Sequence, residues 1–277
     1  MTDARPRSIG RGVIGLFVLT LGLPTATTAS AQDRSRRFEE VGRFGAAEAR
    51  QGVAVDERYF YAISNRRIGK YDKQSGERVA GWEGPADGPI IHLDSGIVLD
   101  GRLYCAHSNY PGVPMVSSIE VFKTDTMEHV DSHSFGIFGG SATWIDRAHG
   151  HWWVAFGHYA GVGGVPGQGP AWTNLVKFDD SWRRVAGYAY PHEVVERFHQ
   201  MSNSGGTWGD DGRLYATGHD DGSVFVLSLP TAGSVLTLHE VIPIAAEGQG
   251  IAWDRSEPGT LYSILRSTRE VVVSKLR

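Results

Sequence analysis

The sequence predicts an all-β fold, and two observations support that prediction. A unit recurs five times between Gln51 and Arg277: a short apolar strand, a turn with an aspartate, and a second strand that opens with an aromatic or leucine-aromatic pair. The turn aspartates also follow one another at intervals of 44, 46, 64 and 44 residues. Repeats of about 40 to 50 residues built from short strands are typical of β-propellers, with one four-stranded blade per repeat.

Each repeat is expected to form one blade of antiparallel strands. The blades are predicted over residues 49–85, 90–137, 138–191, 202–245 and 247–277. The third and fourth strands of the first four blades show the period-two alternation of half-buried strands. They are expected at 68–71 and 78–82, 118–122 and 129–135, 174–178 and 184–188, and 223–227 and 236–241.

The last repeat is one strand short, because its third strand, 270–274, lies close to the end of the sequence. A segment with strand character, Arg37–Phe44, precedes the first blade. Docking residues 37–47 on the outer rim of the last blade would close the ring without a bare edge. The sequence therefore predicts five blades, and the alternative is six if the long loops are strands.

Three insertions are expected to form loops on one face of the ring. Residues 161–170 are rich in glycine and proline, which favours a loop. Residues 191–198 carry apolar side chains at helical spacing, which predicts one or two turns of helix, and residues 109–115 form a further loop. Together they could form a lid over the axis.

Residues 1–31 have the three parts of a secretory signal peptide: early arginines, an apolar run from Val13 to Leu23, and the small-residue site Ala29-Ser30-Ala31. Cleavage would leave residues 32–277 as a single propeller domain, periplasmic or secreted; an uncleaved anchor is the alternative. No later segment approaches 20 apolar residues, so no membrane insertion is expected after cleavage. Cys105 is the single cysteine, so the monomer that we expect has no internal disulfide.

The net charge excludes some partners. It is −4 for the whole chain and −6 without residues 1–31, which contain Asp3 and three arginines. An acidic chain without a basic run is a poor partner for nucleic acid. A small molecule or a peptide is the expected ligand.

Antiparallel topology places the starts of first strands and the ends of second strands on one face of the ring. The turn aspartates Asp56, Asp100, Asp146, Asp210 and Asp254 lie on the opposite face, where they are expected to bond the turn backbone. The polar residues of the first face define a candidate small-molecule site at the top of the central channel. Its predicted binding residues are Gln51, Asn65, Asn109, Ser204, Asp220, Gln249 and Arg266, and its predicted catalytic residues are His107, His158, His219 and Asp94.

The three histidines follow similar aromatic anchors in neighbouring blades, so we expect them to converge. Three imidazoles could hold a divalent metal, zinc or calcium, and activate water. Without a metal, one histidine could act as a general base oriented by Asp94 or Asp220. Arg266 suits a substrate carboxylate or phosphate. The alternative is that the histidines bond the loop backbone; further candidates are His92, His192, His199 and Glu247.

The strand starts carry a family resemblance. Gln51-Gly-Val, Gly206-Thr-Trp-Gly-Asp-Asp-Gly-Arg-Leu-Tyr215 and Gly248-Gln-Gly-Ile-Ala-Trp-Asp254 resemble blades of plant-type glutaminyl cyclotransferases, and more broadly of exported propellers such as gluconolactonase-like hydrolases. Gln249 stands where the cyclotransferase motif has asparagine, and the family's acidic catalytic residue has no match that we can place. The resemblance implies an exported propeller, and the polar, histidine-containing site at the top of its channel is expected to serve a hydrolase, lyase or cyclase. The alternatives are a glutaminyl-peptide cyclotransferase-like enzyme and a non-catalytic scaffold for a protein partner.

Overall fold

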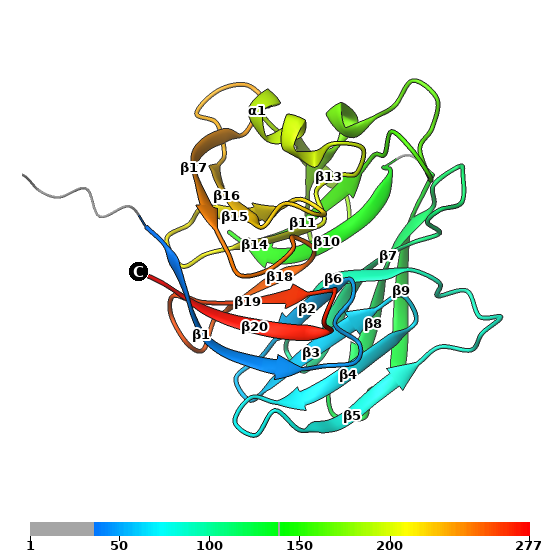
Figure 1. Ribbon diagram of the computed structural model, residues 1–277. Coiled ribbons are helices and arrows are strands. Elements are labelled where there is room, and N and C mark those ends of the chain that lie inside the picture. The colour runs from blue at the N-terminus through cyan, green and yellow to red at the C-terminus, as the bar shows by residue number, and fades with distance from the viewer. Residues whose placement is uncertain (1–35, 138) are drawn as a thin grey trace, which may run out of the picture. The chain divides into compact units, whose positions relative to one another are not determined.

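The computed structural model describes residues 36–137 and 139–277, so the expected signal peptide lies outside the described residues. Twenty strands form five antiparallel four-stranded sheets. The sheets are arranged around a common axis, with one strand of each nearest the centre (Figure 1). The chain is therefore a five-bladed β-propeller, as the repeats predict.

The strand bounds follow the repeats in chain order. Blade 1 contains β2 (Gly52–Val55), β3 (Tyr59–Ser64), β4 (Arg67–Asp72) and β5 (Arg78–Glu83), and blade 2 contains β6 (Leu93–Leu99), β7 (Arg102–Ser108), β8 (Ser117–Lys123) and β9 (His129–Gly136). Blade 3 contains β10 (Ser141–Ala148), β11 (His151–Gly157), β12 (Asn174–Phe178) and β13 (Arg184–Ala189), and blade 4 contains β14 (Gly205–Trp208), β15 (Leu214–Thr217), β16 (Ser223–Ser228) and β17 (Thr237–Pro243). Blade 5 contains β18 (Ile251–Asp254), β19 (Thr260–Leu265), β20 (Glu270–Leu276) and, from the other end of the described chain, β1 (Phe38–Gly45).

The closure of the ring is confirmed. Strand β1 pairs antiparallel with β20, from Phe38 opposite Leu276 to Gly45 opposite Glu270. The ring of Phe44 also stacks on Phe60 of blade 1, with ring centroids 5.1 Å apart. The first strand therefore completes the last blade and also packs on the first, which accounts for five blades rather than six.

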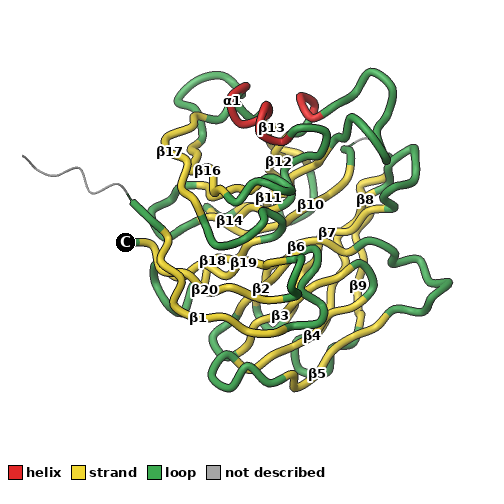
Figure 2. Tube along the Cα trace, in the orientation of Figure 1, coloured by secondary structure: helices red, strands yellow, loops and turns green. Residues whose placement is uncertain are grey.

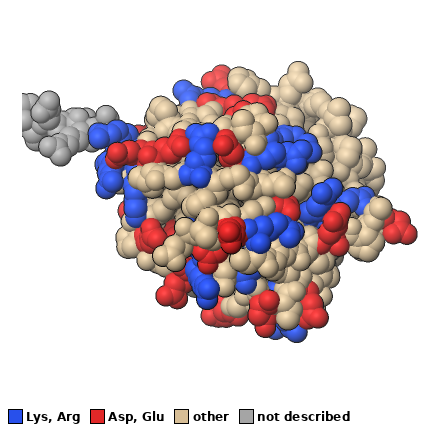
Figure 3. Space-filling model, turned by 60° about the horizontal axis from the view of Figure 1, so that its bottom comes forward, with Lys and Arg blue, Asp and Glu red and all other residues tan. Residues whose placement is uncertain are grey.

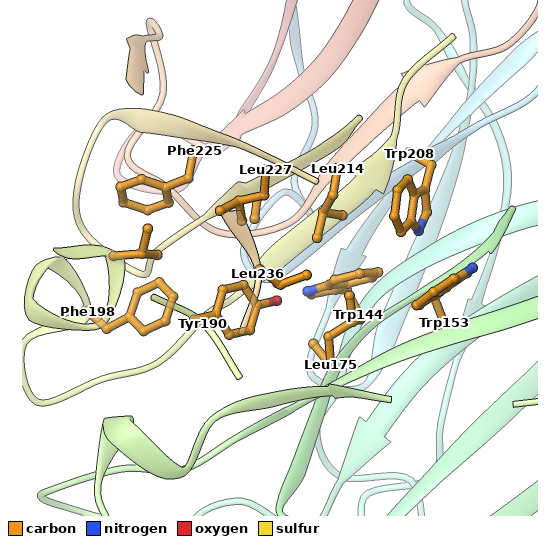
Figure 4. Packing of buried hydrophobic residues seen from close by; sticks show 13 residues of the cluster. Trp144, Trp153, Leu175, Tyr190, Phe198, Trp208, Leu214, Phe225, Leu227 and Leu236 are labelled. Atoms are coloured by element: carbon orange, nitrogen blue, oxygen red, sulfur yellow. The ribbon is translucent and has the colours of Figure 1, made fainter. Parts of the chain in front are cut away.

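Apolar clusters fill the space between neighbouring blades. Between blades 3 and 4, Trp144 and Trp153 pack with Trp208, Leu214 and other buried side chains (Figure 4). These tryptophans therefore belong to the packing between blades. Large aromatic side chains fill the wedge that opens between sheets as they radiate from the axis.

Glycines allow the innermost strands to meet at the axis. The Gly250 amide donates to Gln51 O at 2.9 Å. A Cβ added to Gly250 would lie 2.5 Å from the Cα of Gly52, and one added to Gly52 would lie 2.6 Å from the Cα of Ser95. These backbone contacts lie between an upper and a lower cavity that share no lining residue.

The expected helix between blades 3 and 4 is present as α1 (His192–Val195) and a 3-10 turn, η2 (Glu196–Phe198); a second 3-10 turn, η1 (Pro170–Trp172), ends the glycine-rich loop. These turns lie at the outer edge of the ring, away from its centre (Figure 2). Buried Val194 and Phe198 pack into the apolar cluster, so the helix does not form the lid that we expected over the axis.

The described surface mixes both signs of charge. Figure 3 shows acidic and basic side chains interspersed on the face that it presents. Arg43, for example, binds Glu40 at 2.9 Å and Glu270 at 3.0 Å. Within the described ranges, no helix has the length and apolar character needed to cross a bilayer.

Candidate functional site

A cavity of about 210 Å³ opens at the top of the axis, on the face where the first strands begin. Every blade contributes to its wall. The lining residues are Gln51 from blade 1, His92, Asp94 and Tyr110 from blade 2, Tyr159 from blade 3, Met201, Ser204 and His219 from blade 4, and Gln249 and Arg266 from blade 5. We call this cavity the axial pocket.

Asp94 is the buried acid of the axial pocket. Asp94 is 4% exposed, and its Oδ1 accepts a hydrogen bond from the amide N–H of Ser95 at 3.1 Å. Burial raises the pKa of this carboxyl well above its usual range, and the Ser95 amide and the Arg266 charge offset that only in part. Burial therefore favours the neutral form of this carboxyl, which is able to donate a hydrogen bond.

Two tyrosines and a histidine form an aromatic wall beside Asp94. The ring of Tyr110 packs 5.0 Å from the rings of both His92 and Tyr159. Nε2 of His92 lies 4.0 Å from Oδ2 of Asp94. Burial, together with nearby positive charge, lowers the pKa of His92 to about 4, so the imidazole is neutral at pH 7.

Arg266 supplies the positive charge of the axial pocket. Its Nη1 lies 3.0 Å from Nε2 of His219, and Nδ1 of His219 lies 2.6 Å from Oδ1 of Asp220. A guanidinium only donates, so Nε2 must accept and the imidazole proton is on Nδ1, directed at Asp220. His219 thus orients the guanidinium, and the exposed Asp220 fixes the imidazole tautomer.

Two amides complete the wall. Gln51 donates from Nε2 to Oδ1 of Asn65 at 2.6 Å, so Asn65 positions Gln51 without lining the pocket itself. Gln249 has a φ of 69° and donates from Nε2 to the carbonyl of His219 at 3.1 Å.

His107 does not face the axial pocket. Its Nε2 accepts the Ile91 amide N–H at 3.1 Å, and its Nδ1 lies 2.8 Å from the Ser118 hydroxyl, which donates to Glu120 at 2.6 Å. Burial lowers the pKa of this imidazole. His107 therefore holds the backbone of the segment that carries His92. This is the role that the loop-bonding alternative predicts for it.

His158 lies in a different cavity, of about 320 Å³, that shares the Tyr159 side chain with the axial pocket. Its Nε2 lies 3.2 Å from the carbonyl oxygen of Gly139, and burial lowers its pKa. His107, His158 and His219 thus occupy three separate surroundings. The expected convergence on zinc or calcium is not found: across residues 36–137 and 139–277, no group of three or more His, Cys, Asp or Glu side chains is placed to hold a metal ion.

The structure brings together part of the predicted set. Gln51, Asp94, Ser204, His219, Gln249 and Arg266 share the axial pocket. Asn109 is used within its own loop, where Oδ1 accepts the Val116 amide at 2.7 Å. Sequence analysis did not single out Tyr110, Tyr159 and Met201, although both tyrosines directly follow predicted candidates.

The opposite end of the axis holds a larger cavity, about 360 Å³, whose lining includes Asp56 and Asp146. Asp56 accepts the Tyr59 amide at 2.7 Å and the Tyr61 hydroxyl at 2.7 Å. Asp146 accepts the Trp208 amide at 2.7 Å and pairs with Arg255 at 2.6 Å, so it joins blade 3 to blades 4 and 5 rather than bonding only its own turn. These carboxylates already have structural partners, and we therefore place the working site at the axial pocket.

No protein-family model matches the chain, and no curated protein matches it. Among solved structures, it is similar to the WD40 β-propeller domain of Doa1, with a TM-score of 0.44 and 10% identity over 81% of this chain and 78% of that one. It is similar to the WD40 repeats of RRP9 at a TM-score of 0.43 and 12% identity, over 81% and 79% of the two chains. Likenesses of this size do not bear on function, and the assignment of a five-bladed propeller rests on the strand pairing of the chain itself.

Proposed function

We propose that the protein acts through the axial pocket on a small polar molecule, as an acid–base enzyme of the hydrolase, lyase or cyclase type. The observation that carries this proposal is the convergence of polar side chains from all five blades on one cavity of about 210 Å³. Ligand pockets are concave and contain a few convergent polar groups on a preformed wall. The cavity is smaller than the roughly 300 to 1,000 Å³ typical of drug-sized ligands, which favours a small metabolite.

Asp94 is the residue that we propose as the acid. A carboxyl whose pKa is raised by burial holds its proton more strongly and can transfer it to a bound substrate, as general acids do. His92, whose Nε2 lies 4.0 Å from Oδ2 of Asp94, is neutral. It can therefore hydrogen-bond the substrate without adding a charge beside the acid. Perturbed acids in a cleft are candidates for catalysis for this reason.

Two other functions remain as alternatives. A glutaminyl-peptide cyclotransferase-like activity is a cyclase of the proposed class, and the strand-start motifs favour it. A protein-binding scaffold is favoured by exposed valines on outermost strands, Val41, Val79, Val130 and Val185. We also propose that the protein is exported, on the basis of residues 1–31.

A ligand screen tests the proposal. Thermal denaturation is followed across a panel of neutral and charged metabolites that includes peptides with an N-terminal glutamine. A ligand at 100 times its Kd should stabilise the protein by about 2.7 kcal/mol. Active compounds are then measured with Asp94→Leu, which removes the hydrogen-bonding group, and with Asp87→Leu at an exposed loop position as the control.

Binding that is lost in Asp94→Leu and kept in Asp87→Leu assigns the ligand to the axial pocket. Turnover that is lost in Asp94→Asn, with binding retained, assigns the acid. Binding that survives Asp94→Leu would place the working site elsewhere. No stabilisation by any compound would favour the scaffold.

A further inference from the structure

We infer that the ligand of the axial pocket carries a carboxylate that binds the guanidinium of Arg266. This inference rests on the proposed function and names the class of molecule that the same pocket takes. The proposed function names only a small polar molecule, whereas this inference excludes cations and neutral molecules as preferred ligands.

The first argument is the charge of the wall. Apart from the two tyrosines, four of the lining side chains can carry a charge: His92, Asp94, His219 and Arg266. Burial disfavours the charged forms of Asp94 and His92, and Nε2 of His219 accepts a hydrogen bond from the Arg266 guanidinium. Arg266 is therefore the permanent charge of the wall. The pocket is positive in a chain whose net charge is −4.

Second, among the described residues, Arg266 has no acidic partner. Within the part of the chain that the structure describes, no carboxylate oxygen lies within 4.0 Å of its guanidinium nitrogens. Asp220 is directed at the far nitrogen of His219, and Glu247 accepts the Ser267 amide at 3.0 Å. A partly buried guanidinium without a counter-ion attracts an anion, and bidentate pairing makes a carboxylate the matched group.

The third argument is the orientation of the guanidinium and its surroundings. The bond to His219 fixes one nitrogen and limits the rotation of the side chain. Burial lowers the pKa of Arg50, and the charges of Arg269 and Arg266 lower it further. The three arginines are therefore close enough for Arg50 and Arg269 to add positive potential near Arg266. Such a field raises the local concentration of anions at the mouth.

The rest of the wall suits a small, flat monocarboxylate. The neutral carboxyl of Asp94 can donate to an oxygen at the other end of the ligand, and the rings of Tyr110 and Tyr159 offer an apolar side. A phosphate dianion is less well matched, because the lining offers one guanidinium and no second cation. His219 is a positioning residue, since it acts on the ligand through Arg266.

Matched acid and amide pairs test this inference by thermal shift and calorimetry: lactate with lactamide, benzoate with benzamide, and inorganic phosphate alone. Each amide has the shape of its acid but no charge. We expect at least one acid to bind at least tenfold more tightly than its amide. Arg266→Gln should raise the Kd of that acid at least tenfold and leave the amide unchanged.

Arg183→Gln is the control, because Arg183 is an exposed arginine whose side chain is 80% exposed and pairs with Asp179. It should bind the acid as the unaltered protein does. His219→Gln should weaken acid binding less than Arg266→Gln does, because it disturbs the orientation of the guanidinium but keeps its charge.

The outcomes separate this inference from the proposed function. If acid and amide bind equally well and both lose binding in Asp94→Leu, the inference of a carboxylate ligand is wrong, but the axial pocket is still the binding site. Binding of phosphate without any acid would overturn it in favour of a phosphoryl group. If neither acid binds, the inference is wrong. The ligand screen described under the proposed function then tests separately whether the axial pocket binds a small molecule.

Discussion

Asp94→Asn should stabilise the protein at neutral pH. The substitution keeps the size of the side chain and removes its ability to ionise. Asp94 is 4% exposed, and the contact nearest to an ion pair is the neutral His92 at 4.0 Å. Its ionised form therefore has little to offset the loss of hydration, and its folded-state pKa lies well above the ordinary value.

The sign and size of the effect follow from proton linkage. In the unfolded chain, Asp94 releases its proton near pH 3.9, whereas the folded protein retains it. Its contribution to stability is therefore fully present below that pH and is lost as the pH rises towards the folded-state pKa. The loss is about 1.4 kcal/mol per pH unit within this window, and asparagine shows none of it.

Urea unfolding at pH 4, 5, 6 and 7 measures this difference. Asp94→Asn should match the original protein most closely at pH 4 and gain on it by up to about 1.4 kcal/mol per pH unit as the pH rises towards the folded-state pKa of Asp94, without a change in m value. Asp87→Asn, at an exposed position, should follow the original protein throughout. A difference that stays constant from pH 4 to pH 7, or that favours aspartate as the pH rises, would refute the burial argument.

Four further outcomes are expected. Gly250→Ala should lower the unfolding free energy by roughly 1–3 kcal/mol, because its Cβ would meet the Gly52 backbone, whereas Gly45→Ala, with no atom within 4 Å, should not; equal effects in calorimetry would contradict the crowding at the axis. Deleting residues 36–47 should lower stability by several kcal/mol and expose β20, and an unchanged melting temperature would argue against the closure. His107→Ala should lower stability by roughly 1–3 kcal/mol while ligand binding persists, because it leaves the partly buried Ile91 amide without its acceptor; loss of binding with unchanged stability would instead favour a catalytic role for His107. Mass spectrometry of protein from the native host should find an N-terminus at Gln32, and an intact Met1 would exclude cleavage.

The candidate site could be predicted only in part, and the histidines show why. His107, His158 and His219 follow their aromatic anchors, Tyr104, Trp153 and Tyr215, by three, five and four residues. Side chains alternate between the faces of a strand, so the odd intervals of His107 and His158 and the even interval of His219 do not direct all three to one side. Strand length adds a second difference: β7 continues to Ser108 and includes His107, whereas β15 ends at Thr217, before His219.

The sequence by itself determined the number of blades, the segment that completes the last one and the face on which the strand starts gather. These properties depend on local periodicity and on a count of strands, which the order of residues contains directly. Only the tertiary structure decided which polar residues meet. The meeting of Arg266 with His219, the burial of Asp94 and the wall of Tyr110 and Tyr159 arise from contacts between blades. Such contacts depend on the distances, burial and side-chain directions that the assembled ring imposes.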